Sequence, residues 1–294
     1  MITYRIRLIS KKKLKKMKRI YTAVLLSLLI CASAFAQDLK VATYNIRYAS
    51  SNDIGNLWQD RAPYVAALVR FHDFDVFGTQ EGLPEQLTDL EGMLPTYSRY
   101  GKGRDDGKDK GEHSAIYYKK DKFTRLNQGD FWLAENPDVP AKGWDATCCN
   151  RIVSWVNLKD NDSGKEFFFF SAHYDHQGQI ARKESSKLVL KKIKEIAKEK
   201  PVIFVGDLNA DHESEPYKIL QDSKEIVDTY TLVQEPYHNN GSFNSFKTPD
   251  NSTVIDHIFV TPGIKVSKWG ILTDSYFGKY PSDHFPVVSV LSLP

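Results

Sequence analysis

Apolar runs of strand length recur along most of the chain, with polar segments between them. They cover residues 39–43, 76–78, 115–118, 152–158, 166–172, 201–205, 254–260, 264–269 and 285–293. Several are apolar almost throughout, such as the four phenylalanines from Phe167 to Phe170. Continuous runs of this length are typical of strands that are buried on both faces. The pattern therefore predicts that these strands lie in the interior of the protein.

Helical patterns lie between the apolar runs. In residues 179–200, four apolar side chains recur at helical spacing and form one stripe on a lysine-rich helix: Val189, Ile193, Ile196 and Ala197. Shorter helices are predicted at 59–70 and 84–93, and the glycine-rich, charged segment 101–111 is predicted to be an exposed loop. Strands buried on both faces, with helices available to cover them, indicate two stacked sheets with helices outside.

The first 36 residues have the three parts of a secretory signal peptide. A basic stretch from Met1 to Arg19 contains no acid, an apolar run follows at 23–30, and Ala34-Phe35-Ala36 fits a cleavage site. The apolar core is shorter than the ~20 residues that a membrane-spanning helix needs. We therefore expect an exported protein, periplasmic or extracellular, with no stable membrane anchor and a single domain at 37–294.

Removal of this segment reverses the sign of the net charge. Nine of the 40 lysines and arginines lie in residues 1–36, but none of the 37 aspartates and glutamates does. The remaining chain has 31 basic against 37 acidic side chains, a net charge of −6, whereas the whole chain has +3. Proteins that bind nucleic acid tightly usually present a basic face to the phosphates. The charge therefore does not favour duplex DNA as a partner.

Cysteine usage adds little to the fold prediction. Only Cys148 and Cys149 remain after the predicted cleavage, and neighbouring cysteines pair only through a strained bridge. The sequence leaves their state open, and the fold does not depend on a framework of disulfides.

Polar side chains interrupt the apolar runs at six places. Four runs end in Asn45, in Gln80-Glu81, in His173 and in Asp207-Leu208-Asn209, and two begin after Asp256-His257 and Ser282-Asp283-His284. If all six groups lie at one edge, the last two strands run opposite to the first four, so the sheets are mixed. Rigid strands that deliver polar groups to one rim are where we expect function.

These side chains favour chemistry with a hard divalent cation. Carboxylate and amide oxygens suit Mg²⁺, Mn²⁺ or Ca²⁺ better than a metal that prefers thiolates, and they are offered by Asn45, Glu81, Asp207, Asn209 and Asp283. Two histidines, His173 and His284, supply proton transfer near neutral pH. Each fragment alone is common in turns, but the six together indicate a catalytic site.

Other hydrolytic and metal-binding motifs fail at named positions. A calcium loop that starts at Asp207 needs glycine at its sixth position and glutamate at its twelfth, which are His212 and Lys218. A zinc motif of the metallo-β-lactamase type that ends at His176 needs a histidine where Ser171 stands. The G-x-S-x-G pattern of serine hydrolases does not occur in the chain.

The order of the polar motifs resembles the endonuclease/exonuclease/phosphatase superfamily. The resemblance covers residues 38–294 and rests on Tyr44-Asn45, Gln80-Glu81, Gly111-Glu112 before Tyr117-Tyr118, Ala172-His173, Gly206-Asp207-Leu208-Asn209, Ile255-Asp256-His257 and Ser282-Asp283-His284. It implies a deoxyribonuclease I-like fold, an α/β four-layer sandwich of two mixed β-sheets packed face to face with helices on both outer sides. It also implies a divalent-metal-dependent phosphoester hydrolase, either a phosphodiesterase or a phosphatase. We expect a monomer that acts on a small or polymeric phosphoester.

The resemblance assigns the oxygen ligands to a metal centre. Glu81, with Asn45 and Asp283, would hold the principal metal, Mg²⁺ or alternatively Mn²⁺ or Ca²⁺. Asp207 and Asn209 would position the attacking water and a phosphate oxygen, or bind a second metal.

The resemblance also assigns the proton transfers and the contact with phosphate. His284 would be the general base, oriented by Asp256. His173 would contact the phosphate or serve the leaving group, oriented by Glu112. Arg151 would face the phosphate, as a bidentate partner for an anion.

Two other functions stay open at this point. The first is a 3′-5′ exonuclease that acts on single-stranded RNA, for which release of mononucleotides would decide. The second is a non-catalytic phosphate- or carbohydrate-binding module, although a pure binder needs no general base. The substrate itself stays open among nucleic acid, nucleotide, phospholipid head group, sugar phosphate and inositol phosphate.

Overall fold

Two six-stranded sheets form the centre of the computed structural model, which describes residues 38–249 and 251–294. The first sheet has, in order across it, β11 (Lys265–Ile271), β12 (Val287–Ser292), β1 (Leu39–Asn45), β2 (Val76–Gln80), β4 (Ile116–Lys119) and β3 (Tyr97–Tyr100). The second has β5 (Phe123–Trp132), β6 (Ile152–Asp160), β7 (Glu166–His173), β8 (Val202–Asp207), β10 (Asp256–Val260) and β9 (Val227–Asp228).

Both sheets are mixed, as the placement of the polar groups predicted. In the first sheet β1 is parallel to β2 and antiparallel to β12. In the second sheet β7 is parallel to β8, which is antiparallel to β10. The strands β1, β2, β7 and β8 end in polar residues. The strands β10 and β12, which begin near polar residues, run antiparallel to their neighbours β8 and β1.

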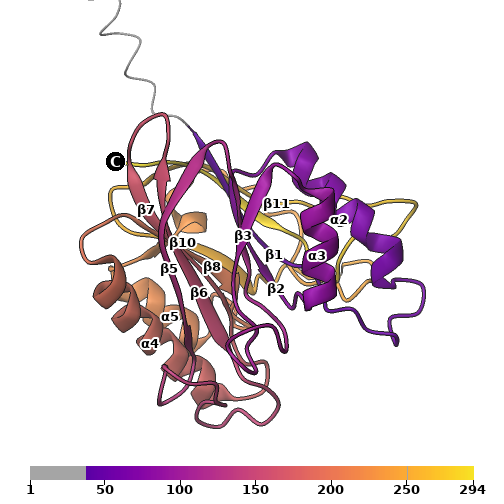
Figure 1. Ribbon diagram of the computed structural model, residues 1–294, viewed down its shortest axis with the longest axis horizontal. Helices are drawn as coiled ribbons and strands as arrows, with labels where there is room; N and C mark the ends of the chain where they lie inside the picture. Colours follow the sequence, from indigo (N-terminus) through magenta and orange to yellow (C-terminus); the bar gives the residue numbers. More distant parts are fainter. Residues whose placement is uncertain (1–37, 250) are drawn as a thin grey trace, which may run out of the picture. The chain divides into compact units, whose positions relative to one another are not determined.

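Helices cover the outer faces of the sheets. They are α2 (Trp58–His72), α3 (Pro84–Met93), α4 (Gln179–Ala197) and α5 (Glu215–Asp222), with a 3₁₀ turn, η1, at Thr229–Leu232. Figure 1 shows α2 and α3 on one side of the paired sheets, and α4 and α5 on the other. The predicted four-layer sandwich is confirmed.

The four consecutive phenylalanines of β7 show how the layers are built. Successive side chains of a strand point to opposite faces of the sheet. Phe167 and Phe169 therefore enter the core between the two sheets, and Phe168 and Phe170 pack in the core beneath α4 and α5. An apolar residue at every position is the signature of a strand covered on both faces.

Three strands and one helix lay outside the predicted set. The strand β5 is ten residues long, but its middle is exposed and polar, because it lies at the edge of its sheet. An edge strand with a solvated face gives no apolar run to detect. The strands β3 and β9 and the helix α5 are short, at four, two and eight residues.

The described residues form one compact unit, Asp38–Pro294. The predicted signal peptide at 1–36, and residue 37, lie outside the described residues. Within the described part, no helix combines the length and apolar character needed to cross a bilayer.

The sheets approach each other closely at Gly78 of β2. A Cβ atom added there would lie 2.6 Å from Ser171 Oγ on β7 and 2.7 Å from Val205 Cγ2 on β8. Both distances are shorter than van der Waals contact, so any larger residue forces β2 away from the second sheet. Gly78 lies two residues before the polar end of β2, where the spacing of the sheets matters most.

We predict that Gly78→Ala destabilises the fold by about 1–3 kcal/mol, because an extra methyl in a well-packed core forces its neighbours to move. The measurement is the free energy of unfolding in denaturant. Gly92→Ala in α3 is the matched control, since an added Cβ meets nothing within 4 Å there and alanine favours a helix. A Gly78→Ala variant as stable as the Gly92→Ala variant would contradict the close packing.

Candidate active site

The polar ends of the strands meet around one cavity of about 780 Å³. Eight of the ten predicted site residues line it: Glu81, Glu112, Arg151, His173, Asp207, Asn209, Asp283 and His284. The other two, Asn45 and Asp256, are completely buried and hydrogen-bond to residues of the cavity wall. The structure therefore brings the whole predicted set together.

Asn45 joins the two sheets at the site. Its Nδ2 donates to Glu81 Oε1 and to Asp207 Oδ2, both at 3.0 Å, and its Oδ1 accepts from the backbone N–H of Arg47 at 3.0 Å. Glu81 follows a strand of the first sheet and Asp207 ends a strand of the second. The backbone carbonyl of Asn45 also accepts from Ser282 Oγ at 2.7 Å, which fixes the segment that carries Asp283.

His284 is held by Asp256, as expected for a histidine that transfers protons. Its Nδ1 lies 2.9 Å from Asp256 Oδ2, and its Nε2 faces Asp207 Oδ2 at 3.7 Å. Burial alone would lower the pKa of His284, but the carboxylates of Asp256 and Asp207 outweigh it and hold that pKa well above its usual value.

His257 points away from the site, as the alternation of side chains in a strand predicts. It neighbours Asp256 in β10, but its Nδ1 lies 3.1 Å from Asp228 Oδ2 and its Nε2 2.9 Å from the carbonyl of Ala210. Burial raises the pKa of Asp228, whereas the hydrogen bonds from His212 and His257 lower it. The hydrogen bonds have the larger effect and lower that pKa to about 2. The His257–Asp228 pair is therefore part of the fold.

Acidic residues from both sheets crowd the part of the cavity around Glu81 and Asp283. Burial raises the pKa of Asp283, and the negative charge of the nearby Glu81 raises it further. Burial and the negative charge of Asp256 raise the pKa of Asp207. The guanidinium of Arg47 lies between two of these groups, 3.9 Å from Glu81 Oε2 and 3.8 Å from Asp283 Oδ2. The arrangement therefore suits a positive charge between Glu81 and Asp283.

Five residues of the cavity wall have left-handed backbone: Arg47, Glu81, Asn209, Ser245 and Phe246. Three of them follow strands. The φ angles are 56° at Arg47, 64° at Glu81 and 46° at Asn209, each just beyond the end of a strand. Asparagine tolerates this conformation, whereas arginine and glutamate adopt it at a cost of about 1–2 kcal/mol. Such backbone strain often accompanies functional sites, because it turns a side chain into a cavity.

A buried arginine of α2, Arg61, shapes two of the loops around the cavity. Its guanidinium donates to backbone carbonyls in the segment after β1 and in the segment before β12, at Ile46, Arg47, Tyr48, Asn56 and Pro281. Its side chain is completely buried. No pattern in the sequence indicated this role, because the partners are backbone atoms.

The expected contact between Glu112 and His173 is not formed. Glu112 Oε2 instead accepts from Arg104 Nη1 at 2.5 Å, while His173 Nδ1 is buried without a hydrogen-bond partner among the described residues. A carboxylate beside a guanidinium pairs with it in preference to a neutral ring, because a hydrogen bond between two charged groups is stronger. Burial and the nearby Arg151 lower the pKa of His173 well below its usual value.

The segment at 101–111 was predicted to be an exposed loop, and this was wrong for Arg104. The side chain of Arg104 is only 11% exposed and lines the cavity. The backbone of the segment is folded onto itself, with the N–H of Arg104 donating to the carbonyl of Glu112 at 3.0 Å. Glycine and charged residues indicate a loop, but they do not show whether its side chains face the solvent or the cavity.

Arg151 lies beside this pair. Its Nη2 is 2.9 Å from His176 Nδ1 and its Nε 3.5 Å from Asp175 Oδ2. Its Nη1 is buried and has no hydrogen-bond partner among the described residues. Burial and Arg104 lower its pKa.

The comparisons with known proteins agree with this geometry. Residues 42–284 match the model of the Endonuclease/Exonuclease/phosphatase family. A crystal structure of a member of that family from Bacteroides thetaiotaomicron is 46% identical, with a TM-score of 0.85 over 88% of this chain and 96% of that one. A mannosyl-6-phosphatase from the same organism is also 46% identical, with a TM-score of 0.85 over 87% of this chain and 100% of that one.

A more distant structure shows only that the fold is shared. Zebrafish (D. rerio) TDP2, complexed with a single-strand DNA product, is 19% identical, with a TM-score of 0.71 over 87% of this chain and 99% of that one. The chain belongs to the endonuclease/exonuclease/phosphatase family, and its fold, its site and its relatives support a phosphoester hydrolase.

We predict that His284→Ala lowers the rate of hydrolysis by ~10²–10⁴, the usual effect of removing a positioned acid–base group. Asp256→Asn should lower the rate of hydrolysis less than His284→Ala does. The double variant should be little slower than His284→Ala alone, because the two residues act as one unit. The measurement is kcat/KM for any phosphoester that the protein hydrolyses.

His257→Gln is the matched control for this prediction. It should keep kcat/KM near that of the wild type but lower the free energy of unfolding by about 3–5 kcal/mol, since it breaks a buried charge pair. An inactive His257→Gln variant beside an active His284→Ala variant would overturn the assignment.

Proposed function

We propose that the protein is a divalent-metal-dependent phosphatase that removes phosphate from sugar phosphate monoesters. The observation that carries the proposal is the buried Nη1 of Arg151, which lacks a hydrogen-bond partner among the described residues at the wall of the cavity. A buried donor without a partner costs about 1–3 kcal/mol, so such a donor fits a ligand with acceptor oxygens.

The arginines of the cavity favour a phosphate monoester over a diester. Three arginines line it, Arg47, Arg104 and Arg151. A phosphate monoester carries about −1.5 to −2 near pH 7, because its second pKa is about 6, whereas a diester carries a single negative charge. Guanidinium groups hold the oxygens of a terminal phosphate through paired hydrogen bonds.

Similarity to the mannosyl-6-phosphatase supports the choice of a sugar phosphate. That protein is 46% identical and all of its length is covered. The apolar part of the cavity lining includes Phe243, which is 42% exposed and packs edge-on against the ring of His284. An exposed aromatic ring beside charged residues suits a molecule with one charged end and one sugar ring.

The acidic side of the cavity fits a divalent cation. Glu81 and Asp283 already have the positive charge of Arg47 between them, and carboxylate and amide oxygens are what Mg²⁺ and Mn²⁺ prefer. Glu81 and Asp283, with Asn45, would hold the metal. When bound, the cation supplies the positive charge that lets a phosphate approach these acids and that stabilises the transition state.

The side chains of the protein supply the remaining parts of the reaction. Asp256 fixes the ring of His284 so that Nε2 faces the cavity, where it accepts a proton from the attacking water. That step needs neutral His284, which positive charge near Asp207 and Asp283 favours by offsetting their effect on its pKa. As the oxygen of water bonds to phosphorus, the bond between phosphorus and the sugar oxygen breaks. The sugar oxygen takes a proton from solvent, and His284 releases the proton of the attacking water to solvent. His173 would hydrogen-bond the oxygens that gain charge.

We predict that mannose 6-phosphate and p-nitrophenyl phosphate are hydrolysed with Mg²⁺ or Mn²⁺ present. The diester bis(p-nitrophenyl) phosphate should be hydrolysed roughly 100-fold less efficiently, because it lacks one charged oxygen that a guanidinium would hydrogen-bond. The measurement is kcat/KM for each ester with the full chain. Activity should disappear in excess chelator and return with the added metal. A diester hydrolysed as well as the monoesters would contradict the proposal.

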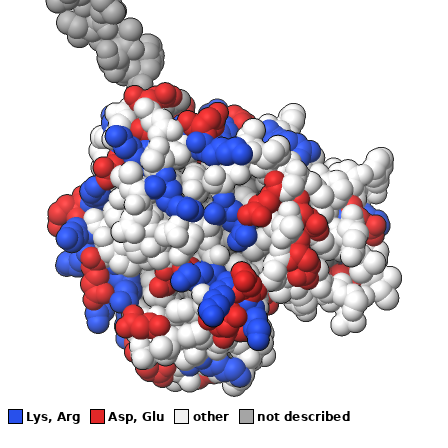
Figure 2. Space-filling model, in the orientation of Figure 1, with Lys and Arg blue, Asp and Glu red and all other residues white. Residues whose placement is uncertain are grey.

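The same experiment separates the other candidate functions. Mononucleotides released from single-stranded RNA, without hydrolysis of sugar phosphates, would decide for an exonuclease. Binding of phosphate that persists in chelator without turnover would decide for a binding module. Duplex DNA is not favoured as a partner, because basic and acidic side chains are interspersed on the face in Figure 2 and the charge after residue 36 is −6.

A second prediction concerns the metal site. Glu81→Ala should abolish activity at limiting Mg²⁺, because it removes a ligand from the acidic side of the cavity. The melting temperature should stay within a few degrees of the wild type, since removal of one crowded carboxylate relieves repulsion from Asp283. Wild-type turnover by Glu81→Ala at limiting Mg²⁺ would remove Glu81 from the proposed ligands.

A further inference from the structure

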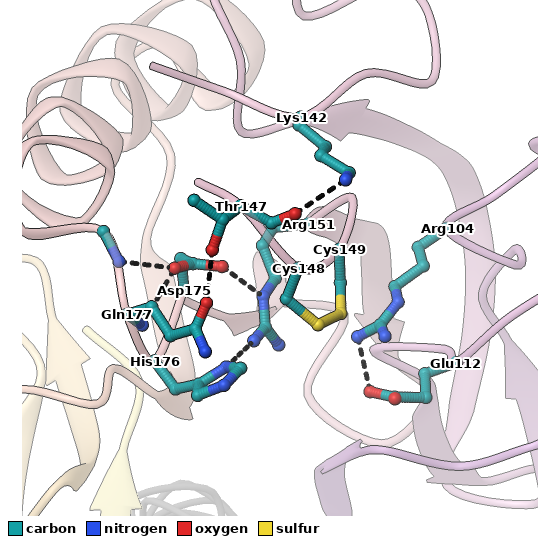
Figure 3. The surroundings of a disulfide bond; sticks show 11 residues. Arg104, Glu112, Lys142, Thr147, Cys148, Cys149, Arg151, Asp175, His176 and Gln177 are labelled. Atoms are coloured by element: carbon teal, nitrogen blue, oxygen red, sulfur yellow. Dashed lines mark hydrogen bonds and ion pairs between the residues drawn. A yellow bond between two sulfur atoms is a disulfide. The ribbon is translucent and has the colours of Figure 1, made fainter. Parts of the chain in front are cut away.

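The cavity wall contains a disulfide that the proposed reaction does not use. Cys148 and Cys149 are joined to each other and line the same cavity as Glu81, Asp207 and His284. Cys148 is exposed and Cys149 is partly exposed. Figure 3 shows the two sulfur atoms between the side chain of Arg151 and the Arg104–Glu112 pair.

This disulfide contributes little to the stability of the fold through chain entropy. A disulfide stabilises mainly by closing a loop in the unfolded chain, and the effect grows with the length of that loop. Cys148 and Cys149 are adjacent in sequence, so the loop is the shortest that the chain offers. A bond that does little for the fold, and that lies in the wall of a catalytic cavity, is better explained by what it contacts there.

The segment that carries the disulfide is held in place on its N-terminal side. Lys142 Nζ donates to the carbonyl of Thr147 at 2.7 Å, and Thr147 Oγ1 donates to Gln177 Oε1. The carboxylate of Asp145 accepts from the backbone N–H groups of Ile180 and Ala181 at the start of α4, at 3.0 and 2.7 Å. The disulfide therefore has a defined position relative to the start of α4.

The C-terminal side of the segment is tied to the arginines. Asn150 Nδ2 donates to the carbonyl of Arg104 at 3.3 Å. Arg151 follows directly and is bonded to His176 and lies against Asp175 (Figure 3). The two sulfur atoms thus adjoin the groups that we propose to bind phosphate.

The chemistry of the sulfur pair differs from that of the rest of this wall. Its neighbours Arg104, Glu112 and Arg151 are charged, whereas a disulfide has no charge and no proton to donate. Divalent sulfur is apolar and polarisable, so it gains dispersion energy against carbon atoms. In a sugar phosphate, the part that offers an apolar C–H surface is the sugar ring.

We infer that the Cys148–Cys149 disulfide is a subsite for the sugar of the substrate, next to the arginines that take its phosphate. The inference rests on the proposed phosphatase function. The disulfide binds the sugar equally in the ground state and in the transition state, since it lies outside the groups that transfer the proton and the phosphate. Its loss should therefore raise KM and leave kcat unchanged.

The test compares the wild type with the variant Cys148→Ser/Cys149→Ser, both as full chains. Loss of one apolar contact in a pocket changes affinity by about tenfold, so KM for mannose 6-phosphate should rise by about that factor with kcat within about twofold. The inhibition constant of inorganic phosphate, which has no sugar, should stay within about twofold of the wild type. The melting temperature should change little, because the bond closes no long loop.

Reduction of the wild type should reproduce the effect of the variant. A water-soluble phosphine breaks the S–S bond, is oxidised to its oxide with the oxygen of one water, and leaves the two protons of that water on the two thiols. Mass spectrometry of the peptide that contains both cysteines, after alkylation, reports the fraction reduced. The serine variant treated in the same way is the matched control and should show no further change in KM.

The outcomes separate the two proposals. A wild type that hydrolyses mannose 6-phosphate, with a variant and a reduced protein of unchanged KM, overturns the subsite and leaves the phosphatase function standing. An equal rise in KM and in the inhibition constant of phosphate also overturns it, because the segment then acts only by holding Arg151. A wild type that neither hydrolyses nor binds mannose 6-phosphate, by calorimetry, overturns the phosphatase function and the subsite together.

Discussion

The amide of Asn45 is the interaction on which the geometry of the site depends. It donates at the same distance, 3.0 Å, to a carboxylate beyond the first sheet and to a carboxylate of the second. Stacked sheets lie about 10 Å apart, so side chains from their two edges meet only if the sheets keep a close and fixed separation. The absence of a side chain at Gly78, against Ser171 and Val205, provides that separation two residues before β2 ends.

Charge is divided across the cavity in a way that follows from this geometry. Glu81 and Asp283 have Arg47 between them, whereas Arg104 and Arg151 line another part of the wall together with Glu112. Buried carboxylates are costly unless positive charge compensates them. Here the compensation comes from groups of the cavity wall, so a cation on one side and an anion on the other both find partners. A metal ion would supply the cation and a phosphate ester would supply the anion.

The sequence predicted the residues at strand ends far better than the residues in loops. Asn45, Asp207 and Asp256 were placed correctly because a strand fixes the direction of each side chain and a buried strand is visible as an apolar run. Arg104 was expected in an exposed loop, and the partner expected for His173 was taken by it. The conformation of such loops depends on backbone hydrogen bonds and on distant partners, which leave no periodic pattern in the sequence. Arg61 is the extreme case, since all the partners of its guanidinium described above are backbone carbonyls.

The division between strand ends and loops also separates the groups proposed to carry out the reaction from the groups proposed to select the substrate. The groups that we assign to water, proton and metal lie at strand ends or in short segments that adjoin them, where the fold leaves them little freedom. The groups that we propose to contact the phosphate and the sugar are Arg104 and the Cys148–Cys149 pair. They come from segments between strands that are positioned by a few side-chain contacts. Loops tolerate change in length and sequence more readily than the strands that they connect. A change in those segments can therefore alter which phosphoester enters the cavity while the strand ends continue to perform the same reaction.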